Sequence, residues 1–166
     1  MKTIVVYQSE TGFTKKHANW IAEKIGCESV PLKEISMASI NEYDRIIFGG
    51  WIMGGTIAGL DKIKEVPDEK KVVFAVGLTG ESKEFSDSLV TTNHLEKITF
   101  HYFQGGINFE QMGFFKKSML KMMRSSISKK KIKTKQEEDM IIGLSKSSDY
   151  SDYNKIHSFV SELSIV

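Results

Sequence analysis

The stretch that decides the fold is "MKTIVVYQSETGFTKK" (residues 1–16), in which an apolar run ends in small hydroxyl residues. The run "TIVVY" (3–7) has strand length and is rich in β-branched residues, which favour strands. Three hydroxyl residues and one glycine follow it: Ser9, Thr11, Gly12 and Thr14. A run with helical spacing comes next and ends at Gly26. The stretch therefore predicts a strand, a tight loop and a helix.

Four further apolar runs of strand length recur along the chain: "ESVPL" (28–32), "RIIFGG" (45–50), "VVFAVGL" (72–78) and "ITFHYFQGG" (98–106). Helical spacing separates most of them, and a last helix is predicted from about Ser151. Alternating strands and helices favour a parallel sheet covered on both faces. We therefore expect an α/β fold, a three-layer sandwich whose five-stranded parallel sheet has the order 2-1-3-4-5, in a single domain over 1–166.

The formal net charge of +2 hides an uneven distribution. Nine lysines and arginines and no acid lie between Lys116 and Lys135, so the rest of the chain is acidic. The opening stretch lacks the long apolar core of a signal peptide, and no later run is apolar enough to span a bilayer, so we expect a cytoplasmic protein. Cys27 is the single cysteine and the four histidines are far apart, so we expect no metal site.

Residues 107–148 are too many for an ordinary connection, and we interpret them as a basic, Met-rich helical insertion after the fifth strand. Its first half predicts a helix with Phe115, Met119, Met122 and Met123 on one side. Lysines interleaved with these apolar residues suit peripheral membrane contact through 114–135, or an apolar redox partner. The alternative is that this helix packs back on the sheet as core. The segment lacks an aromatic platform, so we expect no nucleic-acid binding.

The first loop predicts an anion site, because a loop that enters a helix presents free N–H groups at the positive end of the helix dipole. Its lysines do not have the order of a nucleotide triphosphate loop, and Gly12 alone is not a dinucleotide fingerprint. Hydroxyl groups and the N–H groups around Gly12 instead predict a neutral cradle for an unreactive phosphate. The alternative is that the hydroxyls only cap the helix.

The same segment resembles the Ser/Thr-x-Thr-Gly-x-Thr phosphate loop of flavodoxins at every fixed position. The resemblance implies a flavodoxin-like sandwich and FMN as the cofactor. It also implies that the phosphate is bound by the whole loop: Ser9, Glu10, Thr11, Gly12, Phe13 and Thr14.

Two more loops are expected at the same edge of the sheet, "GGWIMGGT" (49–56) and "GLTGES" (77–82). By similarity to flavodoxins, Trp51 would stack on the flavin ring, and Gly54 or Gly55 would let a peptide reorient when flavin N5 gains a proton. The alternative is that Trp51 is a core residue. The third loop offers no aromatic side chain, which leaves Tyr102, Phe103 or Phe109 for the second ring face. The remaining predicted contacts are Ile52, Met53, Leu78, Thr79 and Gly80.

Two stretches, "YDRIIFGGWIMGG" (43–55) and "FFKKSMLKMMRSS" (114–126), resemble the menaquinone-dependent protoporphyrinogen dehydrogenase group of flavodoxin-domain proteins. The resemblance implies an FMN-dependent oxidoreductase that moves electrons between an organic donor and a quinone or protein acceptor, without a catalytic side chain. Ile52, Met53 and Gly54 stand where that group carries an arginine and a tyrosine. The alternatives are a non-enzymatic flavodoxin electron carrier and a domain that keeps the fold without flavin.

Overall fold

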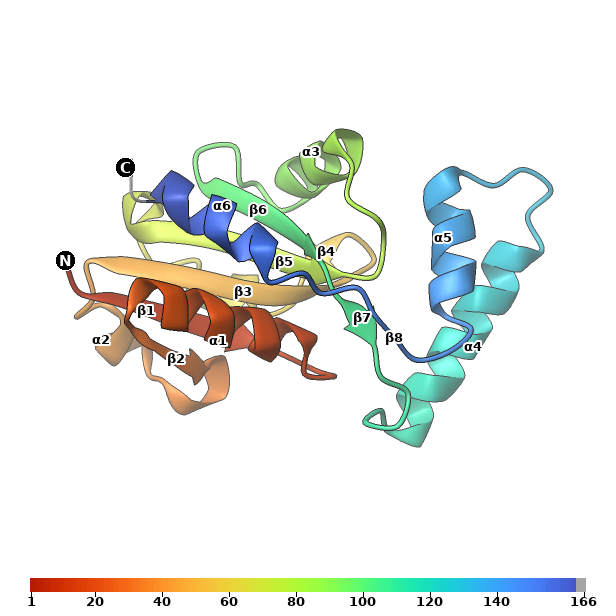
Figure 1. Ribbon diagram of the computed structural model, residues 1–166, viewed down its shortest axis with the longest axis horizontal. Coiled ribbons are helices and arrows are strands. Elements are labelled where there is room, and N and C mark those ends of the chain that lie inside the picture. Colours follow the sequence, from red (N-terminus) through yellow and green to blue (C-terminus); the bar gives the residue numbers. More distant parts are fainter. Residues whose placement is uncertain (164–166) are drawn as a thin grey trace.

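The computed structural model describes residues 1–163, apart from the side chains of Phe115, Lys116 and Gln136. Its centre is a parallel sheet in the order β2-β1-β3-β5-β6 (Figure 1). The strands are β1 (Thr3–Gln8), β2 (Glu28–Pro31), β3 (Arg45–Met53), β5 (Lys71–Gly77) and β6 (Thr99–Gln104). The predicted order of the five parallel strands is confirmed, because β3, β5 and β6 are the third, fourth and fifth of them.

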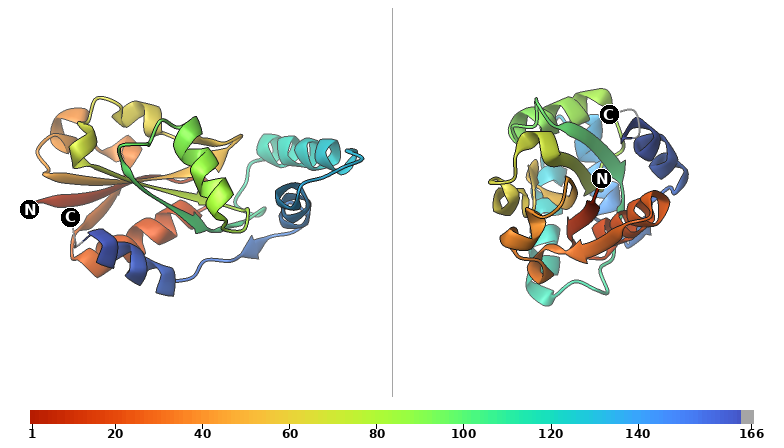
Figure 2. Two further views of the ribbon diagram at one scale, coloured as in Figure 1. Left: turned by 90° about the horizontal axis from the view of Figure 1, so that it is seen from above. Right: turned by 90° about the vertical axis from the view of Figure 1, so that its left-hand side faces the viewer.

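Each face of the sheet packs against its own layer, as Figure 2 shows from two sides. α1 (Phe13–Ile25) and α6 (Asn154–Leu163) cover one face, where Val5 and Tyr7 of β1 point. Ile4 and Val6 point to the other face, because side chains alternate along a strand. That face is covered by α2 (Met37–Ile40), α3 (Lys83–Thr92) and two 3-10 helices, η1 (Leu32–Glu34) and η2 (Leu60–Ile63). A third 3-10 helix, η3 (Asp68–Lys70), directly precedes β5.

The core requires a glycine at Gly49 in β3. A Cβ atom placed there would lie 2.0 Å from Cζ of Phe74, whose ring crosses the neighbouring strand. Phe74 is fully buried and contacts Phe103 and Phe159 edge to face. The ring therefore joins the sheet to α6, and any side chain at Gly49 would displace it.

The insertion leaves the body through a two-stranded antiparallel ribbon, β7 (Gly106–Ile107) and β8 (Ser148–Asp149). Beyond the ribbon, α4 (Phe114–Ser128) and α5 (Lys135–Gly143) project past the carboxyl edge of the sheet (Figures 1 and 2). A capping box of Thr134 and Glu137 begins α5. No described side chain of α4 is buried, so the alternative that this helix packs as sheet core is wrong. Within the described part of the chain, no helix is long and apolar enough to cross a membrane.

Candidate functional site

The first loop ends at Gly12, which is the N-cap of α1 and has a left-handed backbone with φ of 93°. No side-chain hydrogen bond caps the helix, so the alternative that the hydroxyls only serve as caps is wrong. Thr14 is buried in the first turn, while Ser9 and Thr11 are partly buried in the loop. The N–H groups at this helix start therefore keep the positive end of the helix dipole open to an anion.

Ser9 and Trp51 both lie at the carboxyl edge of the sheet. The last pair of the β1–β3 register joins Gln8 to Gly50, and Ser9 and Trp51 are the residues that follow this pair. Ser9 Oγ and Trp51 Nε1 are both buried, and neither has a hydrogen-bond partner among the described residues. A buried donor without an acceptor costs about 1–3 kcal/mol. Two such donors beside the open end of α1 favour a ligand with acceptor oxygens at this place.

The second loop differs from the prediction, because Trp51, Ile52 and Met53 belong to strand β3. The chain then turns at Gly54 and Gly55, with φ of 59° and 84°, and returns as β4 (Thr56–Ile57). Two glycines with positive φ make the two-residue turn that matches the twist of a hairpin. The stretch 49–56 is therefore a β-hairpin and not an open loop. The side chain of Met53, at its tip, is exposed.

The third loop is held by side chains of the neighbouring strand β6. The hydroxyl of Tyr102 donates to the carbonyl of Thr79 at 2.5 Å, and Nε2 of Gln104 donates to the carbonyl of Leu78 at 3.1 Å. Burial, with a smaller effect of Glu81, raises the pKa of Tyr102 far above its ordinary value, so its hydroxyl remains a donor. The predicted contacts Leu78, Thr79 and Gly80 thus form a fixed wall.

Leu78 faces the insertion. A Cβ atom placed at Gly143, the last residue of α5, would lie 2.5 Å from Cδ2 of Leu78, and one at Gly80 would lie 3.8 Å from Oδ2 of Asp139. The insertion therefore stands beside the third loop.

Two of the aromatic residues predicted for the second ring face are core residues. Tyr102 packs edge to face with Phe85, and Phe103 lies against Phe74. Phe109, the third of these residues, stays a prediction.

The ribbon and the start of the insertion lie along the first loop, which the sequence did not indicate. Nζ of Lys16 is 2.7 Å from Oδ2 of Asp149 on β8. Burial raises the pKa of Asp149, but hydrogen bonds from Lys16 and Ser151 outweigh it and hold that pKa below its ordinary value. Oε1 of Gln111 is 3.5 Å from the position of a Cβ at Gly12. These contacts join residues more than ninety positions apart, so no local pattern could have revealed them.

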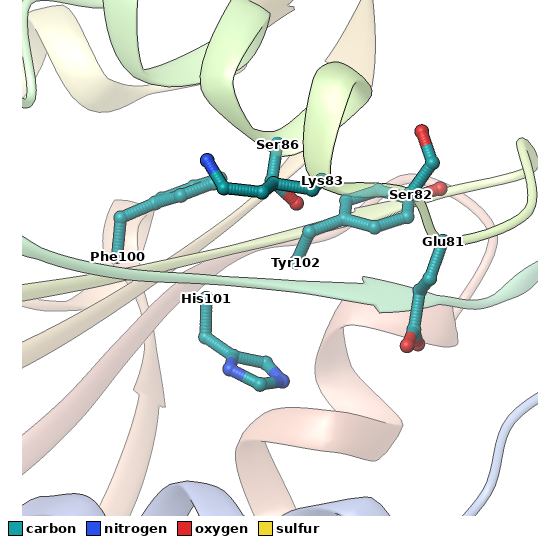
Figure 3. A pocket seen from close by; sticks show the side chains of 7 residues that line it. All are labelled: Glu81, Ser82, Lys83, Ser86, Phe100, His101 and Tyr102. Carbon is teal, nitrogen blue, oxygen red and sulfur yellow. The ribbon is translucent and has the colours of Figure 1, made fainter.

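A cavity of about 360 Å³ lies along the outer edge of strand β6, where Glu81 and Ser82 at the end of the third loop line it together with the start of α3 (Figure 3). Phe100 and Tyr102 point to one side of the strand and His101 to the other. Burial lowers the pKa of His101, which favours a neutral ring. The cavity is open and brings no nucleophile and base together. The described residues contain no cluster of three or more metal-ligating side chains.

Residues 4–135 match the family model described as Flavodoxin domain. The chain belongs to this family. The flavodoxin assignment agrees with the strand order and with the position of the first loop after β1. No curated protein matches the chain.

Solved structures of flavodoxins and related proteins are similar to this flavodoxin domain. One is a flavodoxin from the domain Archaea, 18% identical over 67% of this chain and 88% of that chain, with a TM-score of 0.45. Another is a WrbA-like protein from Agrobacterium tumefaciens, 14% identical over 94% and 97%, with a TM-score of 0.47. A third is a flavoprotein in complex with FMN from Lactobacillus acidophilus NCFM, 18% identical over 62% and 91%, with a TM-score of 0.41.

Proposed function

We propose that this chain is an FMN-dependent redox protein that moves electrons between an organic donor and a quinone or protein acceptor. The observation that carries the proposal is the first loop, where α1 starts without a side-chain cap beside two unpartnered buried donors, Ser9 Oγ and Trp51 Nε1. A phosphate monoester offers acceptor oxygens to these donors and places its negative charge at the helix start. The family to which the chain belongs supports FMN as the bearer of that phosphate.

The loop residues fit the phosphate of FMN. The hydroxyls of Ser9, Thr11 and Thr14 and the N–H groups at the start of α1 would hold it, with Gly12 in the backbone conformation that turns the loop around the anion. Trp51 adds an indole donor, which has no acceptor role and so suits an anion. When bound, FMN supplies the redox chemistry through its ring, which takes up and gives back electrons and protons.

The protein's own part is to place the ring between the hairpin β3–β4 and the third loop. The third loop is already fixed by Tyr102 and Gln104, so binding need not order it. No pair of side chains in these loops is arranged for acid–base work, and the protein acts by binding, orienting and covering the ring.

The insertion is the proposed contact with a partner. Phe114 and Met122 are 89% and 67% exposed on α4, and the exposed Lys121 and Arg124 lie two or fewer residues from Met122 in the sequence. Exposed apolar side chains within a basic surface favour contact with the face of an anionic membrane, and quinones are dissolved in membranes. We propose that 114–135 makes a peripheral membrane contact. Oxidation of a protoporphyrinogen-like donor is the finer form of this proposal, and the resemblance of the insertion favours it.

The cofactor proposal is tested by the visible spectrum of the purified protein and by titration with FMN. We expect a flavin band, or quenching of FMN fluorescence when FMN is added to the colourless protein. A preparation that shows neither would mean that the domain keeps the fold without flavin.

Enzyme and electron carrier are separated by steady-state kinetics with a soluble quinone. We propose turnover, because the basic insertion is unlike the acidic docking face of simple carriers. A protein that exchanges electrons with a redox protein but shows no turnover with quinone and any organic donor tested, including a porphyrinogen, would be a carrier.

The membrane proposal is tested with lipid vesicles of phosphatidylcholine, with and without phosphatidylserine. The double variant Lys121→Glu/Arg124→Glu should lose binding to the anionic vesicles by more than about thirtyfold, since each cation removed near such a surface costs about 1 kcal/mol and the two added carboxylates are repelled by it. Lys62→Glu/Lys64→Glu makes the same charge change at exposed positions on the body and should leave binding as it is. Equal loss in both double variants would mean that net charge, and not the insertion, directs the contact.

A further inference from the structure

Asn93 caps the end of α3 and reaches the hairpin β3–β4 with its side chain. Its Nδ2 donates to the carbonyl of Gly55 at 2.8 Å and to that of Leu89 at 2.9 Å, and its Oδ1 accepts from the N–H of Ile57 at 2.9 Å. One side chain thus bonds the turn, the returning strand and its own helix. Asn93 is half-buried, so water competes only weakly for these bonds.

Further contacts hold the returning strand of the hairpin on the side of the turn that Asn93 bonds. Ile57 is buried, and its side chain fills the space beside Gly50, where a Cβ would lie 2.5 Å from Cγ2 of Ile57. The N–H of Ala58 bonds the carbonyl of Trp51 at 2.9 Å. The returning strand is therefore held to β3 by the bond of Ala58 and to the end of α3 by Asn93.

The peptide between Gly54 and Gly55 differs from its surroundings. Both residues have positive φ, and a Cβ at Gly54 would meet no atom within 4 Å. Asn93 holds the carbonyl of Gly55, which belongs to the next peptide, so it does not hold the central peptide of the turn. A glycine pair lets that central peptide rotate at low energetic cost while the anchors stay in place.

We propose that Asn93 is a positioning residue for the flavin: it holds the hairpin so that Trp51 and the Gly54–Gly55 peptide stay at the ring, although Asn93 itself does not reach it. The inference rests on the proposed FMN function. Asn93 is uncharged and acts through geometry alone, and a shift of about 1 Å in a positioning group is enough to weaken function strongly.

Asn93→Leu tests the proposal, because leucine has a similar size and neither donates nor accepts. We expect its FMN dissociation constant, measured by fluorescence titration, to rise about tenfold, and its flavin midpoint potential to shift from that of the wild type. The matched control is Asn19→Leu, which removes a hydrogen bond of 2.7 Å between Ser29 Oγ and Asn19 Oδ1 on the body. This control should keep both the affinity and the potential.

Asn93→Asp keeps one of the two hydrogen bonds to the hairpin and removes the other, and it provides a second test if Asn93→Leu fails to fold. Aspartate keeps an acceptor for the N–H of Ile57 but sets an oxygen against the carbonyl of Gly55. Thr92→Asp adds the same charge at the neighbouring exposed residue. We expect the potential of Asn93→Asp to move further than that of Thr92→Asp.

Two results would overturn the proposal. One is an Asn93→Leu protein whose FMN dissociation constant stays within twofold of the wild type and whose potential is unchanged. The other is an Asn93→Asp protein that behaves as Thr92→Asp does. In both cases the wild type binds FMN, so the proposed function stands while the role of Asn93 fails. A wild type without FMN binding would instead remove the proposed function, and this inference with it.

Discussion

Replacing Gly143 by alanine should loosen the contact between the insertion and the third loop. Gly143 is buried at the end of α5. An added Cβ would lie 2.5 Å from Cδ2, 2.7 Å from Cγ and 3.1 Å from Cδ1 of Leu78. Carbon atoms in contact are normally about 3.5–4.0 Å apart, so either Leu78 or the end of α5 must move.

The magnitude follows from two opposed effects. Overpacking of this kind costs about 1–3 kcal/mol, whereas alanine in place of glycine favours a helix by up to about 1 kcal/mol. The second effect is smaller at the last residue of a helix, where fewer hydrogen bonds depend on it. We therefore expect a local loss of about 1–2 kcal/mol, which raises the open population of α5 about five- to thirtyfold.

Amide hydrogen exchange measures this opening directly, because it reports local free energies along the chain. Exchange of the α5 amides should quicken in Gly143→Ala, while the amides of β1 and β3 keep their protection. Gly113→Ala is the matched control: Gly113 is the N-cap of α4 with φ of −64°, and a Cβ there meets no atom within 4 Å. Its effect should stay within about 0.5 kcal/mol.

The double variant Leu78→Ala/Gly143→Ala identifies the partner of the added methyl group. If the collision is with Leu78, Gly143→Ala should cost almost nothing in the Leu78→Ala background, which gives a coupling energy of about 1–2 kcal/mol. The reasoning is refuted if Gly143→Ala costs the same in both backgrounds, or if α5 exchanges no faster in Gly143→Ala than in Gly113→Ala.

Three further predictions concern the loops and the core. Gly12→Ala should weaken FMN binding about tenfold in a fluorescence titration, because a residue with a side chain is strained by about 1–2 kcal/mol at φ of 93°. The control is Gly26→Ala, with φ of 79° at the other end of α1: this variant should lose a similar amount of folding stability but keep its affinity for FMN. Tyr102→Phe should cost about 1–3 kcal/mol in urea unfolding, since it leaves the buried carbonyl of Thr79 without its donor, and a loss below about 0.5 kcal/mol would contradict this. Burial lowers the pKa of His17, although the hydrogen bond of its ring to the carbonyl of Phe13 opposes this shift, so the unfolded chain binds a proton at this histidine more readily than the folded chain does. The free energy of unfolding should therefore fall as the pH drops below about 6.5. His17→Gln should reduce this pH dependence, which urea midpoints at several pH values measure.

The sheet was predictable because its strands are buried on both faces. Runs such as 3–7 and 45–50 are continuously apolar, and their alternation with helices leaves few possible topologies. The first loop was predictable as well, because the chemistry of an anion site is carried by adjacent residues, Ser9 to Thr14.

The second loop was not predictable in the same way. The run from Gly49 to Thr56 contains the glycine pair of a hairpin turn, but a glycine-rich stretch after a parallel strand also has the pattern of a ligand loop, and the sequence alone does not separate the two. One of the contacts that hold the hairpin comes from Asn93, thirty-eight residues after Gly55. Helix α4 was predictable from the helical spacing of its apolar residues, but its position beyond the carboxyl edge depends on contacts such as that of Lys16 with Asp149.

The ribbon β7–β8 allows the insertion to vary independently of the sheet. Gly106 pairs with Asp149 and Ile107 with Ser148, so the chain departs and returns at points only about 5 Å apart. A two-residue turn such as Asn-Gly could join Ile107 to Ser148 and close the ribbon as a simple hairpin. Evolution can therefore lengthen, shorten or replace everything between them while the register of the parallel sheet stays intact, and one scaffold can serve many partners.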